Sequence, residues 1–378
     1  MEINVSTTEL NKLTNFAALS ERSKADSDKY IDKVFVTVQN NTLTLERIGL
    51  HAAKKSKALA VDGDGKDFSF QVDYSAFKAV IGKVATRFDQ VNIVLKGDEL
   101  KINAGRIKTQ LSVTELSKPV IEDDSTAQDE ICVQTADFLS LIGQVRASSA
   151  KGDVRYYLNG ICFQTDNLAN NLLHAIATDG HRMAKGECEF LAHEYEKERS
   201  VIVSNECVSY LDSILKDTSD KQVVLHLTSS FMSITLDDGT SIRMKIIDGR
   251  FPDWKRVVPC THTGIVNLDR ANFTESIRSA ITLANPKFKG GRFFFKPSGC
   301  DLYSTSQIGS YEEVIEVQGY EGDDCEIGFN LEYVLSALNV IEDDSIVIRL
   351  NGSNGSAVIH GDNSDNTSTF HVVMPTRL

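Results

Sequence analysis

The sequence lacks the features that identify membrane proteins and metalloproteins. No stretch approaches the roughly 18–20 apolar residues that a membrane-spanning helix requires. The seven cysteines are scattered, none forms a CxxC pair, and no pair of histidines stands beside them at ligand spacing. We therefore expect no disulfide framework, no metal site, no cofactor and no membrane partner, and we expect a reducing compartment.

Basic residues are also fewer than acidic ones. The chain has 40 Lys and Arg against 53 Asp and Glu, which gives a formal net charge of −13. This balance argues against a protein that wraps nucleic acid with a general basic surface, although it is compatible with a local basic face. The opening residues MEINVSTTEL contain neither the basic nor the apolar region of a signal peptide, so we expect a cytoplasmic protein.

The sequence is rich in short segments that alternate apolar and polar residues, as strands of a half-buried sheet do. The clearest of them are 33–38, 41–48, 68–73, 91–95, 223–227, 231–236, 292–297, 312–317 and 345–350. Longer segments with helical periodicity interrupt these strands, and several begin at a Ser, Thr, Asp or Asn in the N-cap position. The predicted helices are 7–24, 73–87, 135–150, 204–217, 267–284 and 329–341.

The helices recur in pairs along the chain at a period of about 130 residues, which is a repeat at the scale of a domain. Strands separate the two helices of each pair, and a strand hairpin follows the second helix. The repeat predicts an α+β fold of three similar domains, at residues 1–122, 128–258 and 259–378. The acidic segment 121–130 is the expected first linker.

One motif, ATDGHRMA at 177–184, places Asp179, His181 and Arg182 around a glycine. These side chains serve in acid–base and phosphate chemistry, so a hydrolase that uses Asp179 and His181 is one alternative. However, neighbouring loop residues cannot easily point at one another as base and orienting group, and no nucleophile motif such as GxSxG accompanies them. A β-turn with Gly180 at positive φ is the simpler interpretation.

Six motifs occur in the second and third predicted domains in an order typical of one family. They are DVRYYLNGICF (153–163), ATDGHRMA (177–184), DGRFPDWKRVVP (248–259), PKFKGGR (286–292), IGFNLEYVLSAL (327–338) and VVMPTRL (372–378). With these motifs the sequence resembles the bacterial sliding clamp, the beta subunit of DNA polymerase III. The first predicted domain matches mainly by pattern, and GRIKTQLS (105–112) is its best segment.

The resemblance implies a DNA clamp fold in which two chains join head to tail in a homodimeric ring. Helices would line the hole and β-sheets would form the outer layer. Such a ring encircles double-stranded DNA without sequence preference and tethers the replicative polymerase, so processivity comes from topology and no residue is catalytic. An acidic chain suits this role, because tight contacts with phosphates would impede sliding.

The resemblance also implies one hydrophobic pocket per chain for a short peptide with Leu and Phe anchors. The alpha subunit of DNA polymerase III, the clamp loader and other proteins with a clamp-binding motif would compete for it. Thr376 stands in place of a usual methionine and Asn354 in place of a usual apolar residue, and both make the pocket more polar. The implied pocket residues are Leu158, Thr178, Gly180, His181, Arg182, Met183, Pro252, Arg256, Val257, Phe288, Asn330, Tyr333, Ser356, Val372, Val373, Met374, Pro375, Thr376, Arg377 and Leu378.

Other residues are expected to contact DNA or the second chain. The predicted helices are close to neutral, whereas the rest of the chain carries the acidic excess. The candidates for DNA contact are Arg22, Lys24, Lys78, Lys83, Arg87, Arg146, Lys151, Arg155, Tyr156 and Tyr157. The candidates for the dimer interface, where edge strands of the first and third domains would pair, are Thr109, Leu111, Thr282 and Leu283. A repeat-built interaction scaffold with no DNA role is the alternative that the acidic charge favours.

Overall fold

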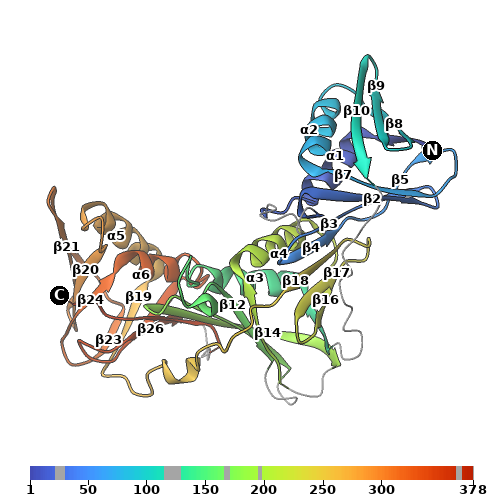
Figure 1. Cartoon of the computed structure of the whole chain (residues 1–378). Helices are drawn as coiled ribbons and strands as arrows, with labels where there is room; N and C mark the ends of the chain where they lie inside the picture. Colours follow the sequence, from blue (N-terminus) through green and yellow to red (C-terminus); the bar gives the residue numbers. More distant parts are fainter. Residues whose placement is uncertain (22–29, 115–128, 166–170, 195–197, 363–367, 378) are drawn as a thin grey trace. The chain divides into compact units, whose positions relative to one another are not determined.

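The computed structural model describes residues 1–21, 30–114, 129–165, 171–194, 198–362 and 368–377 (Figure 1). Three residues predicted above as site residues, Arg22, Lys24 and Leu378, lie outside the described residues, as does most of the predicted linker. The chain divides into two compact units. Unit 1 comprises Met1–Cys132, His193–Tyr195 and Asp217–Ile246, and unit 2 comprises Val133–Ala192, Glu196–Lys216 and Ile247–Leu378.

The described residues of unit 1 combine two α-helices, which pack against each other, with one antiparallel succession of strands. The helices are α1 (Thr7–Phe16) and α2 (Tyr74–Ala85). The strands pair in the order β1 (Glu2–Ser6), β8 (Gln90–Lys96), β9 (Glu99–Ala104), β10 (Ile107–Thr114), β7 (Phe68–Asp73), β2 (Lys33–Gln39), β3 (Thr42–Ile48), β4 (Ala52–Lys55), β18 (Ser241–Lys245), β17 (Phe231–Thr235) and β16 (Gln222–Leu227). Two short strands, β5 (Leu59–Ala60) and β6 (Asp62–Gly63), pair with β3 and β1.

The helices begin where the sequence predicts, because side chains cap them. Ser6 accepts a hydrogen bond from the amide of Glu9 at the start of α1, and Asp73 accepts one from Ala76 at the start of α2. The prediction that the first helix continues to residue 24 is wrong over its described part, because α1 ends at Phe16. The buried ammonium of Lys54 donates hydrogen bonds to the carbonyls of Phe16 and Ala18 and terminates the helix there. No helix of the described residues is long and apolar enough to cross a membrane.

Unit 2 contains four α-helices, two 3-10 helices and two sheets among its described residues. The helices are α3 (Thr135–Arg146), η2 (Tyr156–Leu158), α4 (Asn205–Asp217), η3 (Trp254–Arg256), α5 (Arg270–Leu283) and α6 (Leu331–Leu338). The longer sheet has the order β15 (Ser200–Ser204), β12 (Gly160–Thr165), β13 (Leu172–Thr178), β14 (Arg182–Glu194), β27 (Phe370–Val373), β26 (Ala357–Gly361), β25 (Ser345–Leu350), β19 (Gly264–Asp269) and β23 (Gly319–Gly322). The shorter sheet has the order β22 (Gly309–Ile315), β21 (Gly299–Ser306), β20 (Gly290–Lys296) and β24 (Cys325–Asn330), and β11 (Asp129–Gln134) precedes α3.

The same local arrangement recurs at the two ends of the chain. The strand before α1 pairs with the strand after α2, and the strand before α5 pairs with the strand after α6, antiparallel in both cases. Each pair of helices also packs side by side. The fold is α+β, as the repeat in the sequence predicts. The division into three domains at 1–122, 128–258 and 259–378 stays a prediction.

The residues predicted for the dimer interface lie at the edges of sheets or beside them. Thr109 and Leu111 lie on β10, which over this stretch pairs only with β9 among the described strands. Thr282 and Leu283 lie at the end of α5, and Leu283 lies beside Gly309, the first residue of β22. Because β22 pairs only with β21 in the described part of the chain, it is an edge strand too.

Two glycines in unit 2 give a matched test of close packing. A Cβ on Gly160 would lie 2.2 Å from the carbonyl oxygen of Val203 in the neighbouring strand, whereas a Cβ on Gly143, inside α3, would meet nothing within 4 Å. We expect Gly160→Ala to lower the free energy of unfolding by about 1–3 kcal/mol. Gly143→Ala, in contrast, is expected to raise it by up to about 1 kcal/mol. Urea unfolding of both variants measures this, and equal effects would contradict the close approach.

Candidate functional site

An apolar cavity of about 250 Å³ lies in unit 2. Its walls come from η2 and the residue before it, the turn between β13 and β14, the segment around η3, and β27 with the residue that follows it. The residues that line it are Arg155, Tyr157, Leu158, Thr178, Gly180, Arg182, Met183, Phe251, Pro252, Trp254, Val257, Val372 and Met374. Leu158, Met183 and Val372 are buried in its floor, while Met374 is 44% exposed at its rim. The cavity therefore offers apolar surface to a ligand that arrives from solvent.

The pairing of β14 with β27 assembles this cavity from distant parts of the chain. Met183 pairs with Val372, and beyond the strand the amide of Met374 donates a 3.0 Å hydrogen bond to the carbonyl of His181. Beneath the cavity, a cluster of buried side chains joins these strands to their neighbours. Its members are Ala150, Leu158, Cys162, Ile176, Met183, Ile202, Phe251, Val358, Phe370 and Val372. The apolar residues of VVMPTRL therefore belong to an ordered strand and its continuation, which form one wall of the cavity.

The motif ATDGHRMA forms the turn between β13 and β14. Gly180 has φ +90, a conformation that suits glycine, and a Cβ there would lie 2.9 Å from the guanidinium of Arg155. One carboxylate oxygen of Asp179 accepts hydrogen bonds from the amides of His181 and Arg182 at 2.9 and 3.1 Å. The hydroxyl of Thr178 donates to the carbonyl of Arg182 at 2.7 Å. Asp179 is thus engaged in forming the turn and is poorly placed to act as a base.

Arg182 binds within this turn and connects it to two other parts of unit 2, the end of α3 and α6. Its guanidinium donates to the second carboxylate oxygen of Asp179 at 3.0 Å, to the hydroxyl of Ser336 at 2.6 Å and to the carbonyl of Ala147 at 2.5 Å. It also lies 4.4 Å from the centre of the Tyr333 ring. The planar guanidinium presents several N–H donors in fixed directions, so it can bond all of these partners at once. The single ammonium of a lysine could not.

Arg155 and Tyr157 were predicted to contact DNA, and the structure places both in the wall of this cavity. Arg155 forms two hydrogen bonds with the carboxylate of Asp153, at 3.1 and 2.8 Å, and donates to the carbonyl of Asp179 at 3.3 Å. The hydrogen bonds from Arg155 lower the pKa of Asp153 to about 2. The guanidinium is therefore held at the rim of the cavity by an ionised partner.

The sequence interpretation missed two lining residues, Phe251 and Trp254. Trp254 was expected only to pack, and it does so, 6.2 Å from the ring centre of Phe370. Its indole Nε1 also donates a 3.2 Å hydrogen bond to Gln164. The available signal was a single tryptophan in a segment bracketed by prolines at a predicted junction between domains, where pockets preferentially occur.

Several residues predicted for the pocket lie away from this cavity. Tyr333 lies against the guanidinium of Arg182 and Val373 pairs with Arg182, but neither lines the cavity. Asn330 caps α6 by accepting a hydrogen bond from Glu332. Phe288 is 63% exposed beneath the ammonium of Lys287, which is 5.3 Å from its ring centre. Also outside the lining are His181, Arg256, Ser356 and Pro375.

Thr376, Arg377 and Asn354 lie together at a different cavity of about 770 Å³. Asp323, Asp324 and Glu326 also line it, so its surface is polar. The two departures from the family pattern, Thr376 and Asn354, therefore lie at this polar cavity and outside the lining of the apolar cavity beside Met374.

The remaining DNA-contact candidates are mostly exposed side chains on or near helices. Lys83, Arg87 and Lys151 are exposed, and Tyr156 is 57% exposed. Lys78 lies 5.8 Å from the ring centre of Tyr74, and Arg146 forms a 3.2 Å ion pair with Asp212. Lys83, Arg87, Lys151 and Tyr156 are therefore available to a ligand.

Replacement of Arg182 tests whether the hydrogen bonds of its guanidinium stabilise the folded protein. Arg182→Lys keeps the charge but cannot reach Asp179, Ser336 and Ala147 at once, so we expect the free energy of unfolding to fall by about 2 kcal/mol. Arg256→Lys is the control, because that guanidinium is 85% exposed and, among the described residues, forms an ion pair with Asp253 alone. The control should change stability by less than about 0.5 kcal/mol. If urea unfolding gives the same value for both variants, the role assigned to Arg182 is wrong.

Because His371 is buried, we expect the free energy of unfolding to depend on pH. Burial, aided by the charge of Arg182, lowers its pKa from 6.5 to about 4, so the folded protein keeps the ring neutral where the unfolded chain binds a proton. Stability therefore falls as the pH drops below 6.5, by about 2 kcal/mol between pH 7.5 and pH 5, and this effect levels off below pH 4. Thermal unfolding of His371→Phe should show a smaller loss over this range, and an unchanged pH dependence would refute the assignment.

Comparisons with known proteins agree with the geometry. The chain matches the family models of the DNA polymerase III beta subunit, central domain, over residues 132–253 and C-terminal domain over residues 255–377. It is 31% identical over 289 residues to the beta sliding clamp of Vibrio cholerae and 30% identical over 290 residues to that of Escherichia coli, with 76% of each chain covered in both cases. The crystal structure of the DNA polymerase III subunit beta from Pseudomonas aeruginosa covers 100% of both chains, with a TM-score of 0.90 and 25% identity. The chain therefore belongs to the family of the DNA polymerase III beta subunit, the beta sliding clamps.

Proposed function

We propose that this protein is a sliding clamp that encircles double-stranded DNA and tethers a replicative DNA polymerase to confer processivity. The observation that carries the proposal is the apolar cavity beside the paired strands β14 and β27, in a chain of the beta sliding clamp family. The family is that of a non-catalytic processivity factor, which leaves no place for a hydrolase built on Asp179 and His181. We place the protein in the cytoplasm.

The cavity is proposed as the site where partners dock a short peptide. Apolar anchors such as Leu and Phe would fill it, and the few anchors buried at such a site carry most of the binding energy. One solved neighbour, the DnaN sliding clamp of Pseudomonas aeruginosa bound to griselimycin, has a TM-score of 0.89 and 25% identity to this chain. The partners proposed here are the alpha subunit of DNA polymerase III, the clamp loader and other proteins that carry a clamp-binding motif.

The ring is proposed from the edge strands. Over residues 107–112, β10 pairs only with β9, and β22 pairs only with β21 among the described strands, so both present free backbone groups. Pairing of one with the other in a head-to-tail dimer would satisfy both edges and close the ring. Thr109, Leu111 and Leu283 lie on or beside these edges, which supports their place in the interface. Three domains per chain, at 1–122, 128–258 and 259–378, belong to the same proposal.

Release from linear DNA tests whether the protein holds DNA topologically. The protein is loaded by a clamp loader onto nicked circular DNA and isolated by gel filtration, and the DNA is then cut once. We expect the protein to remain on the circle and to leave within minutes of cutting, because a ring slides off free ends. Blocking both ends with streptavidin should retain it. Retention on open linear DNA, or no association with the circle, would favour a site-bound protein or a scaffold without a DNA role.

A further inference from the structure

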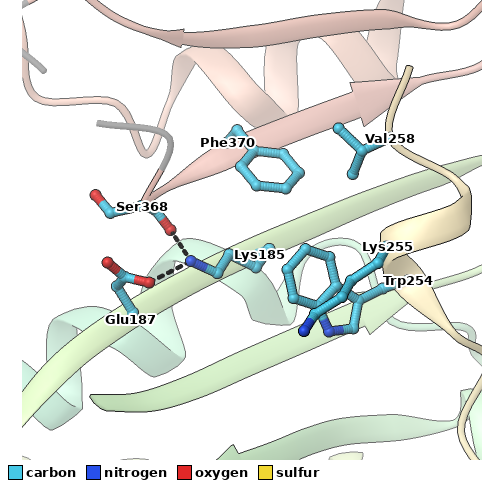
Figure 2. Close-up of a pocket in the computed structure, with 7 residues that line it drawn as sticks. All are labelled: Lys185, Glu187, Trp254, Lys255, Val258, Ser368 and Phe370. Atoms are coloured by element: carbon cyan, nitrogen blue, oxygen red, sulfur yellow. Dashed lines mark hydrogen bonds and ion pairs between the residues drawn. The ribbon is translucent and has the colours of Figure 1, made fainter. Parts of the chain in front are cut away.

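A second cavity, of about 380 Å³, shares Trp254 with the apolar cavity. Figure 2 shows its residues: Phe370 and Val258 lie on one side, Trp254 and Lys255 on another, and Lys185 points between them toward Glu187. Because Trp254 is part of both linings, the two cavities adjoin at its ring. A chain that fills the first cavity can therefore continue over Trp254 into the second.

Trp254 is held in place, so it forms a fixed wall between the two cavities. Its Nε1 donates a hydrogen bond to Gln164, and its ring lies 6.2 Å from that of Phe370 and 6.5 Å from that of His174. Aromatic neighbours at these separations stabilise one another beyond the area that they bury. The apolar part of the second cavity is thus formed before any ligand arrives.

The buried charges of the second cavity neutralise one another. Lys185 is 4% exposed, and its ammonium contacts the carboxylate of Glu187 and donates a 2.7 Å hydrogen bond to the carbonyl of Ser368 (Figure 2). Glu187 also lies 3.2 Å from Nδ1 of His174. Hydrogen bonds from His174 and then Lys185 lower the pKa of Glu187 to about 2, which keeps the carboxylate ionised. The pair of Lys185 and Glu187 therefore adds no net charge.

Lys255 supplies the charge that is left for a ligand. Its side chain is exposed, its ammonium lies 5.7 Å from the centre of the Trp254 ring, and it forms no ion pair with a described residue. An ammonium on an aromatic face stays near that face and keeps its donors free for an anion. In a chain of net charge −13, such a site is a local exception that an acidic ligand can find.

We propose that the second cavity is a subsite for the partner peptide, and that it takes an acidic side chain in the segment next to the apolar anchors. The proposal rests on the function proposed above for the first cavity. A Glu or Asp side chain matches the subsite, because its carboxylate pairs with Lys255 while its short apolar stem lies on Trp254. Since a peptide leaves the first cavity over Trp254 in one direction, an acid on only one flank of the anchors reaches the subsite.

Fluorescence polarisation with three labelled peptides tests this subsite. All three carry the same Leu and Phe anchors; one has a Glu-Glu pair on the N-terminal flank, one has it on the C-terminal flank, and one has Gln-Gln on both. We expect one acidic peptide to bind about three- to fivefold more tightly than the neutral peptide at low salt. This preference should shrink as the ionic strength rises.

Three variants of the full chain test whether Lys255 recognises the acidic side chain. Lys255→Met should abolish the preference for the acidic peptide while leaving the affinity for the neutral peptide unchanged. Lys287→Met is the matched control, because Lys287 also lies on an aromatic ring, 5.3 Å from the centre of Phe288, and lines neither cavity. It should keep the preference. Lys255→Glu should reverse the preference in favour of a Lys-Lys flank.

The outcomes separate the subsite from the docking pocket. If all three peptides bind with equal affinity to the unaltered protein, or if the preference survives Lys255→Met, the subsite is refuted while the pocket stands. If both acidic peptides bind more tightly than the neutral peptide by the same factor, the protein binds the acidic side chain at another position, and the subsite is again refuted. If no peptide binds at all, the docking function itself is wrong, and the subsite falls with it.

Discussion

The pairing of β14 with β27 is the interaction on which the site depends. It brings Met183 beside Val372 and orders the chain as far as Met374, so that residues from distant parts of the sequence share one apolar floor. Arg182, the first residue of β14, secures this pairing by bonding Asp179, Ser336 and Ala147 at once. Leu158 and Phe251, from two other segments that line the cavity, pack in the same buried cluster as these strands.

The same arrangement explains why a motif rich in catalytic residue types performs no chemistry. Asp179 accepts two amide hydrogen bonds and one from a guanidinium, which are the contacts that close a tight turn. The charged groups of ATDGHRMA are therefore engaged in holding the turn and in joining it to α6 and the end of α3, and most of the surface left to a ligand is apolar. A site for holding a peptide requires this distribution, whereas a hydrolase would require a base with free lone pairs.

Local sequence patterns predicted most of the helices and strands. The placement of the site residues depends in addition on contacts between distant parts of the sequence. Alternation and caps located the strands and the helix starts, because these signals lie within a few residues of one another. The end of α1 was missed because distant Lys54 determines it. Met183, Pro252 and Met374, which the family motifs predict for the pocket, line the apolar cavity. The motifs could not show that Trp254 lies in the wall, or that Thr376 and Asn354 lie at another cavity, since these placements depend on pairing between strands far apart in the sequence.

The origin of the cavity walls in strands far apart along the chain has a consequence for the lifetime of the protein. A peptide that fills the cavity binds only while β14 and β27 are paired, so it binds the folded state and not the unfolded one. By mass action, a partner present at a hundred times its dissociation constant adds about 2.7 kcal/mol to the free energy of unfolding. An engaged molecule therefore opens less often and presents fewer sites to proteases than an idle one. Occupancy of the cavity thereby couples how often the protein is used to how long it persists.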